Sequence, residues 1–166
     1  MILRHGARSI LDYGAGKGMQ YQPMPVRVEG IEEWPSIQAF WSVNEIRCYD
    51  PCYQPFNTLP GEKFDGVIST DVLEHCPEED IPWIVDEIFG YANKFVFANV
   101  ACYPAKKRLP SGENAHCTIR PPEWWSDILR ETSIRYPAID WEVWVQYVVN
   151  TATGNQYVEQ RLANTD

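Results

Sequence analysis

The sequence lacks an apolar run long enough to span a bilayer as a helix, because none reaches the required length of about 18 residues. Its opening stretch, MILRHGARSILDY, has the apolar pattern of a strand and not that of a signal peptide. The five cysteines are odd in number and contain no CxxC pair, which disfavours a disulfide framework. We therefore expect a cytoplasmic protein with reduced cysteines and no membrane partner.

Basic residues are also scarce. Lysine and arginine number 14 against 23 aspartates and glutamates, which gives a formal net charge of −9 and a pI near 4.8. A field of this sign repels phosphate backbones, and the sequence shows neither a basic face nor an NPPY-like acceptor motif. A nucleic-acid partner is therefore disfavoured, and a small-molecule ligand fits better.

The 166 residues, 45% of them hydrophobic, are enough for one domain with one core and too few for two. Short apolar runs that end in turn residues predict buried parallel strands, and apolar residues at helical spacing predict the helices between them. The predicted elements are strands at 8–13, 46–50, 64–70 and 94–100, helices at 36–44, 81–89 and 122–131, and a terminal hairpin of 140–149 with 156–162. We therefore expect a single α/β domain over residues 1–166, with a doubly wound, mostly parallel Rossmann-like sheet and a C-terminal antiparallel hairpin.

The first motif is the glycine-rich segment LDYGAGKG, which follows the first predicted strand. Glycines at alternate positions (Gly14, Gly16 and Gly18) let the backbone turn tightly and approach a ligand, and the helix start expected next would offer free N–H groups. A glycine-rich turn without a ligand explains the segment equally well. This motif alone leaves both interpretations open.

The second motif is Asp50 in YDP, at the end of the second predicted strand. A carboxylate at this place can accept hydrogen bonds from both hydroxyls of a ribose, although it can also cap the following turn. The third motif is FDGVISTDVLEH, in which Asp71, Glu74 and His75 follow the third predicted strand. All three motifs fall at the carboxyl ends of parallel strands, where ligands bind in sheets of this kind.

In this order the three motifs resemble the class I S-adenosylmethionine-dependent methyltransferases, over residues 10 to 100. The resemblance implies an enzyme that binds S-adenosylmethionine as its cofactor and transfers the methyl group, and we expect a small-molecule acceptor. It implies these cofactor-binding residues: Asp12, Gly14, Gly16 and Gly18 around the methionine part, Asp50 at the ribose, Pro51 near the adenine, and Thr70, Asp71 and Val72 at the amino end or the sulfonium.

The sequence departs from the family's pattern after Asp50. The segment before Phe64 is too short for the helix, strand and connection that the family usually has there, so we expect the edge strand to be shortened or missing. The adenine pocket is then the least defined part of the site, and its candidate walls are Tyr49, Pro51, Cys52, Phe56 and Leu59. We expect a minimal version of the fold, whose uncovered surface a homodimer would cover.

The long loop over residues 105–125 follows the last predicted parallel strand, and its length and its glycine and proline content suit a lid over the acceptor. His116 is the residue in this loop that can take a proton near neutral pH, so it is the candidate catalytic residue. The alternative is a loop histidine that hydrogen-bonds to the backbone. The basic residues at 106–108 would admit an acidic or phosphorylated acceptor, or they are a solvated part of the loop.

Other classes of function fit less well. A dinucleotide-binding oxidoreductase requires GxGxxG and an acid about 20 residues later, and neither spacing occurs here. We expect no metal site, because the spacings of the cysteines and histidines match no known zinc pattern; the residues considered are Cys48, Cys52, His75, Cys76, His116 and Cys117. The alternative from another class is a non-catalytic cofactor-binding or regulatory module with a methyltransferase fold.

Overall fold

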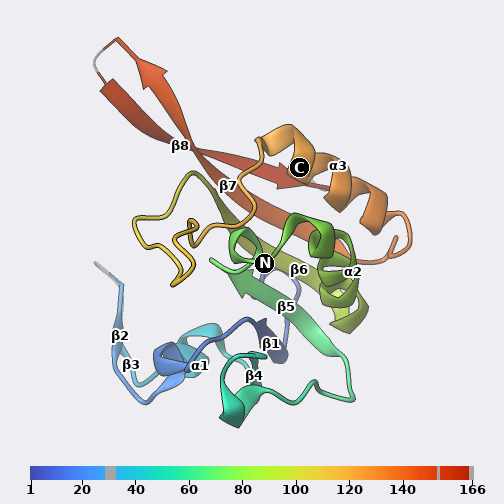
Figure 1. The fold of residues 1–166 in the computed structure, drawn as a ribbon. Coiled ribbons are helices and arrows are strands. Elements are labelled where there is room, and N and C mark those ends of the chain that lie inside the picture. Colours follow the sequence, from blue (N-terminus) through green and yellow to red (C-terminus); the bar gives the residue numbers. More distant parts are fainter. Residues whose placement is uncertain (29–32, 153, 165–166) are drawn as a thin grey trace.

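The computed structural model describes residues 1–28, 33–152 and 154–164. Its main strands are β1 (Ser9–Tyr13), β4 (Glu45–Tyr49), β5 (Phe64–Thr70), β6 (Ala92–Cys102), β7 (Asp140–Thr151) and β8 (Gly154–Ala163), and its helices are α1 (Ile37–Trp41), α2 (Ile81–Tyr91) and α3 (Pro122–Ser133). The strands form one six-stranded sheet in the order β4-β1-β5-β6-β7-β8 (Figure 1). Neighbouring strands from β4 to β7 are parallel, and β8 is antiparallel to β7. The predicted α/β class, with a mostly parallel sheet and a C-terminal hairpin, is therefore confirmed and is consistent with a Rossmann-like fold.

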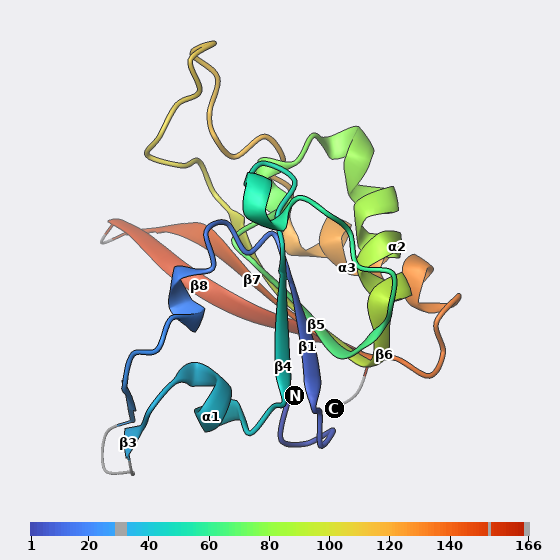
Figure 2. The same ribbon diagram turned by 90° about the horizontal axis from the view of Figure 1, so that it is seen from below.

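Helices lie on both faces of the sheet, with α2 and α3 on one face and α1 on the other (Figure 2). Neighbouring residues of β1 pack against the two opposite faces of the sheet. Ile10 and Leu11 are both fully buried, but they belong to two separate apolar clusters. Successive side chains of a strand point to opposite faces, so one cluster lies on each side. The larger cluster includes Trp125 of α3 and Phe89 of α2, and it forms most of the core.

The predicted unit of strand, helix and strand around α2 is confirmed. β5 has the predicted bounds, and a turn of 3-10 helix, Glu78–Asp80, leads into α2. Pro82 lies in the first turn of α2, where a missing N–H removes no helical hydrogen bond. The buried residues of α2 are those predicted from the spacing: Ile81, Ile84, Val85, Ile88 and Phe89.

The connection from β1 to β4 differs in part from the prediction. A single turn of 3-10 helix, Met19–Tyr21, follows the glycine loop, so the prediction of a helix start at this place is wrong. Pro23 and Pro25 come next, and a proline can neither donate a backbone hydrogen bond nor fit inside a helix. The chain instead forms a small antiparallel pair, β2 (Val26–Arg27) and β3 (Glu33–Trp34), which the sequence analysis did not include.

The short helix predicted at 36–44 is present as α1, although it is shorter than expected. The Ser36 side chain accepts a hydrogen bond from the backbone amide of Ala39 at 3.2 Å, which starts the helix. Ser42 then takes the left-handed conformation, with φ 57°, and ends it. α1 therefore has local signals at both ends.

The strand order places a switch point at the carboxyl ends of β1 and β5, because the chain leaves β1 toward β4 and leaves β5 toward β6, on opposite sides. Residues 51–63, all of them described, contain a 3-10 turn and no strand, so β4 forms the edge of the sheet. The edge strand that we expected to be shortened or missing is therefore missing from this segment. The loop from β6 to α3 extends beyond this same carboxyl edge (Figure 2). None of the described helices is both long and apolar enough to cross a membrane.

Candidate functional site at the carboxyl edge of the sheet

The glycine loop connects the ends of β1, β4 and β5. Gly14, Gly16 and Gly18 all have positive φ angles, of 87°, 57° and 61°. The amide of Gly14 donates to the Tyr49 carbonyl at 2.8 Å, which fixes the loop to the end of β4. A Cβ atom at Gly14 would lie 2.4 Å from Cγ2 of Val72, so this glycine is required for close contact with the segment after β5.

Asp12 lies at the carboxyl end of β1 and is 2% exposed. Its Oδ2 accepts hydrogen bonds from the Tyr21 hydroxyl at 2.7 Å and from the Gln20 side-chain amide at 3.0 Å. Burial raises the pKa of Asp12, although these two hydrogen bonds act in the opposite direction. The short turn after the glycine loop therefore positions a buried carboxyl group at the switch point.

Asp50 follows β4 and takes part in the loop structure itself. Its Oδ2 accepts a hydrogen bond from the Gly16 amide at 2.8 Å, and its Oδ1 accepts one from the Cys52 amide at 2.8 Å. The bond to Cys52 caps the turn that begins at the exposed Pro51, which is the alternative role considered for this aspartate. Each carboxylate oxygen has two acceptor positions, so the bonds to the loop leave acceptor capacity for ribose hydroxyls.

The predicted residues Thr70, Asp71 and Val72 lie where β5 ends. Asp71 has a φ of 55°, and its backbone amide donates to Oδ1 of Asn99 at 2.8 Å. The Asn99 side-chain amide donates in return to Oδ1 of Asp71 at 3.1 Å. This reciprocal pair stabilises an uncommon backbone conformation next to the switch point. Thr70 and Asp71 are exposed, whereas Val72 contacts Gly14.

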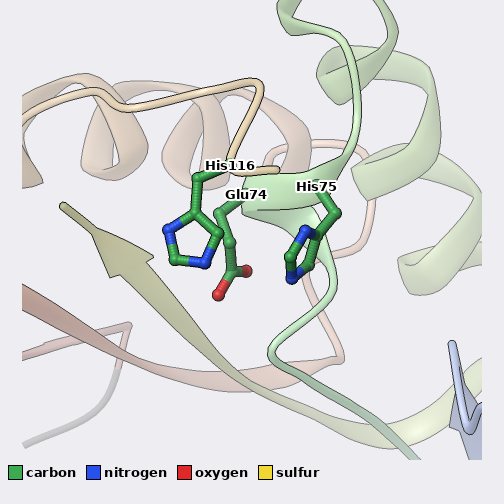
Figure 3. A group of neighbouring side chains, drawn as sticks. All are labelled: Glu74, His75 and His116. Atoms are coloured by element: carbon green, nitrogen blue, oxygen red, sulfur yellow. The ribbon is translucent and has the colours of Figure 1, made fainter. Parts of the chain in front are cut away.

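A second group of polar side chains lies at the same edge, on the side of the long loop. Glu74, His75 and His116 each offer a ligand or acceptor atom, and these atoms all lie within 4.8 Å of one another. Figure 3 shows the Glu74 carboxylate between the two imidazole rings. Glu74 is 1% exposed, and burial raises the pKa of its carboxyl group. The sequence analysis singled out His116 of this group and did not predict that the three would meet.

Backbone carbonyl groups fix the orientation of both histidines. Nδ1 of His75 lies 2.7 Å from the carbonyl oxygen of Ala115, and Nδ1 of His116 lies 2.5 Å from that of Tyr103. A carbonyl oxygen only accepts, so Nδ1 carries the proton in each ring. His116 therefore makes the hydrogen bond to the backbone that we considered as an alternative to a catalytic role. The bond uses only Nδ1, so in the neutral ring Nε2 is still an acceptor and a catalytic role is still open.

Asn114 closes the base of the loop that carries His116. Its side-chain oxygen accepts from the backbone amides of Ala105 and His116, each at 2.9 Å, and its side-chain amide donates to the Ala105 carbonyl at 3.0 Å. Arg108 and Asn114 also form an antiparallel bridge. The long loop predicted as a lid is therefore an internally hydrogen-bonded structure.

A cavity of about 660 Å³ lies beside the two histidines. It extends from the end of β5 to the loop, and residues on its wall include Asp71, Glu74, His75, Tyr103, His116 and Tyr157. Its volume is in the range of small-molecule sites, about 300 to 1,000 Å³. Lys106 and Lys107 also line the cavity, so its wall has basic side chains as well as the acidic Asp71 and Glu74.

Glu74, Asn99, Tyr103 and Asn114 are the main site features that the sequence analysis did not assign. Glu74 belongs to the motif FDGVISTDVLEH, and its position after the end of a strand was the only sign in the sequence of a role in the site. Apart from the short bond between Asn114 and the His116 amide, the partners of these residues lie 9 to 28 positions away in the sequence. No local pattern predicts the distant pairs.

Comparison with known proteins finds no match to this chain among protein-family models, curated proteins or solved structures.

Proposed function

We propose that this protein is a class I-like methyltransferase that binds S-adenosylmethionine and methylates a small-molecule acceptor. The observation that carries the proposal is a set of three aspartates at the carboxyl ends of three adjacent parallel strands. Asp12 is the penultimate residue of β1, Asp50 follows β4 and Asp71 follows β5, with the left-handed glycine loop between them. This is the edge of an open α/β sheet at which ligands bind.

The charge of this edge suits the cofactor. S-adenosylmethionine has a positively charged sulfonium and ammonium group and two ribose hydroxyls. Carboxylates stabilise nearby cations and accept hydrogen bonds from hydroxyls. Asp12 is buried at a cost to its ionised form, and a bound cation would offset that cost. The residues present therefore fit the cofactor.

The same edge is poorly suited to a dinucleotide. A pyrophosphate is usually bound at the N-terminus of the helix that follows the glycine loop, where free N–H groups and the helix dipole meet the negative charge. Here the segment after the loop is one turn of 3-10 helix, Met19–Tyr21. The three aspartates would also repel phosphate groups. The short turn and the three aspartates therefore favour a cationic ligand over NAD.

The acceptor would occupy the cavity beside His116, which shares Asp71 with the proposed cofactor site. When bound, the cofactor supplies a methyl group that is open to attack by a nucleophile. The chain's own part is to hold the acceptor in line with that group, and positioning of this kind accounts for much of the rate in displacement reactions. Nε2 of His116 is the atom able to accept a hydrogen bond or a proton from the acceptor.

The substitution Asp50→Asn tests the cofactor site. Asparagine keeps the size of the side chain and one acceptor oxygen for the loop, but it removes the charge and half of the acceptor capacity. We expect the affinity for S-adenosylmethionine, measured by calorimetry, to fall by roughly tenfold or more, since hydrogen bonds to charged groups contribute about 1.5 to 3 kcal/mol.

Asp127→Asn is the matched control, because Asp127 is an exposed aspartate of α3. This variant should bind like the wild type. Unchanged affinity in Asp50→Asn, with the domain folded, would show that Asp50 only caps its turn. Binding of the cofactor by the wild type without methyl transfer to any of a broad set of small molecules would favour the non-catalytic module.

A further inference from the structure

Glu74, His75 and His116 form a cluster with the donor set of a metal site. Their ligand atoms lie within 4.8 Å of one another, and the described part of the chain contains no second group of this kind. Two imidazoles and one carboxylate bind Zn²⁺ and other first-row divalent ions in proteins. The four cysteines that the sequence analysis considered together with these histidines are not members of the cluster.

Both histidines are prepared as ligands by their hydrogen bonds. A metal-binding histidine usually donates its second ring N–H to a carbonyl or carboxylate, which fixes the tautomer and the ring orientation. His75 and His116 each do so, to the carbonyl oxygens of Ala115 and Tyr103 at 2.7 Å and 2.5 Å. Nε2 of each ring therefore has the lone pair that a metal ion requires.

Glu74 supplies an independent observation that points to a ligand. Its Oε1 accepts a hydrogen bond from the backbone amide of Ala101 at 3.2 Å, in the part of β6 that extends beyond the last residue paired with β5. Its Oε2 is buried and has no hydrogen-bond partner among the described residues. An unpaired buried carboxylate oxygen is costly, and a cation held between the carboxylate and the two imidazoles would remove that cost.

The two segments that carry the three residues are fixed to each other. The Thr118 amide donates to the Glu74 carbonyl at 3.0 Å, and the Thr118 hydroxyl donates to the Cys76 carbonyl at 2.8 Å. The bond from His75 to Ala115 is a third link between the same segments. The fold therefore holds His116 beside Glu74 and His75, although 40 positions separate Ala115 from His75 in the sequence.

We propose that Glu74, His75 and His116 bind one divalent transition-metal ion, of the class that includes Zn²⁺ and Co²⁺. An ion centred between three atoms that lie up to 4.8 Å apart would be less than about 3 Å from each of them. To form ligand bonds of about 2.1 Å, each ligand atom would therefore move toward the ion by less than about 1 Å. Three protein ligands leave at least one coordination position open, as in catalytic metal sites. This proposal replaces the expectation that the protein has no metal site.

The open position would face the cavity that Tyr103, Tyr157 and the two lysines line. Where the proposed methyl transfer holds, the ion would bind an oxygen of the acceptor, so the acceptor class would be small molecules with a hydroxyl or carboxylate group. Metal coordination lowers the pKa of a bound hydroxyl, whose proton then passes to solvent. His116 would act in this arrangement as a ligand and not as a free base.

Metal binding to the purified full chain tests the proposal without any cofactor or acceptor, so its result is independent of the proposed methyl transfer. Co²⁺ is titrated and followed by its visible absorption, and Zn²⁺ is titrated in competition with a chromophoric chelator. The variants are Glu74→Gln, His75→Gln and His116→Gln. His5→Gln is the matched control, because the chain has three histidines and His5 lies outside the cluster.

We expect one bound ion per chain, with unchanged affinity in His5→Gln. Each of the other three variants should bind Co²⁺ at least about 100-fold more weakly, because loss of a partner that only orients a ligand already costs about 10- to 100-fold. Thermal unfolding without metal shows that each variant is folded, and glutamine at position 74 retains an acceptor for the Ala101 amide.

Three results would overturn the proposal. The first is no binding of Zn²⁺ or Co²⁺ by the folded wild type. The second is equal affinity in the wild type and in His75→Gln or His116→Gln. The third is a thiolate charge-transfer band in the Co²⁺ spectrum, which would place the ion on cysteines.

Discussion

Gly14 and Gly16 stand two positions apart in one loop but meet different structural demands. Gly14 has a φ of 87°, and a Cβ atom there would lie 2.4 Å from Val72, whereas a Cβ atom at Gly16, with a φ of 57°, would meet nothing within 4 Å. We expect Gly14→Ala to lower the free energy of unfolding by roughly 2 to 4 kcal/mol, from backbone strain and overpacking, and Gly16→Ala to lower it by about 1 kcal/mol. Urea denaturation measures both. Equal losses would contradict the described contact between the loop and Val72.

The buried carboxyl group of Asp12 makes stability depend on pH. Its pKa is raised above the usual value of 3.8, so the folded state binds the proton more tightly than the unfolded chain does. The free energy of unfolding of the wild type therefore falls as the pH rises from about 4 to the pKa of Asp12 in the folded state, and it stays lower at higher pH. Asparagine does not titrate, so Asp12→Asn has no such decrease from this position.

Urea denaturation of the wild type and Asp12→Asn between about pH 4 and pH 7 checks the sign. The difference in the free energy of unfolding should shift in favour of the variant as the pH rises. A difference that is constant over this range, or that shifts toward the wild type, would show that the hydrogen bonds from Tyr21 and Gln20 outweigh the burial.

At this scale the sequence predicts residues whose role depends on near neighbours. Asp50 and the three glycines follow strand ends, and a strand end with glycines is readable as a local pattern. Glu74 bonds to Ala101 of β6, and Asn114 bonds to Ala105 across its own loop as well as to the nearby His116. The bonds to Ala101 and Ala105 follow from the tertiary structure and have no local signal.

The loop from β6 to α3 is closed at its base by the hydrogen bonds of the Asn114 side chain. Asn114→Ala removes the side-chain hydrogen bonds to Ala105 and His116, and each such bond contributes about 1 kcal/mol. The loop should then open more often, because local opening depends on the hydrogen bonds that close a segment. We expect trypsin to cleave at residues 106–108 at least about tenfold faster than in the wild type.

The control for this experiment is Asn93→Ala, since Asn93 is an exposed asparagine of β6. Its cleavage rate at residues 106–108 should equal that of the wild type. An unchanged rate in Asn114→Ala would mean that the loop is held by other contacts.

The elements that the sequence predicts well carry their own signals. α2 combines an acidic start, a proline in its first turn and regular apolar spacing, and β5 is a continuous apolar run. β2 and β3 have two residues each, which is too short for an alternating pattern. Their pairing depends on the course of the chain after the glycine loop.

For the whole molecule, the order of elements was sufficient to predict the parallel sheet and its antiparallel edge, because crossovers of strand, helix and strand are right-handed and parallel. The meeting of the carboxyl ends of β1, β4 and β5 follows from that topology. The cavity between the long loop and Tyr157 of β8 does not, since it depends on how two distant segments approach each other.

Calorimetric titration of the wild type with S-adenosylmethionine, S-adenosylhomocysteine and NAD measures whether the acidic carboxyl edge binds a cationic adenosyl cofactor. We expect micromolar binding of S-adenosylmethionine, about −8 kcal/mol, weaker binding of S-adenosylhomocysteine because it lacks the sulfonium charge, and no heat with NAD. Binding of NAD, or no binding of either adenosyl compound, would show that this edge is not a site for such a cofactor.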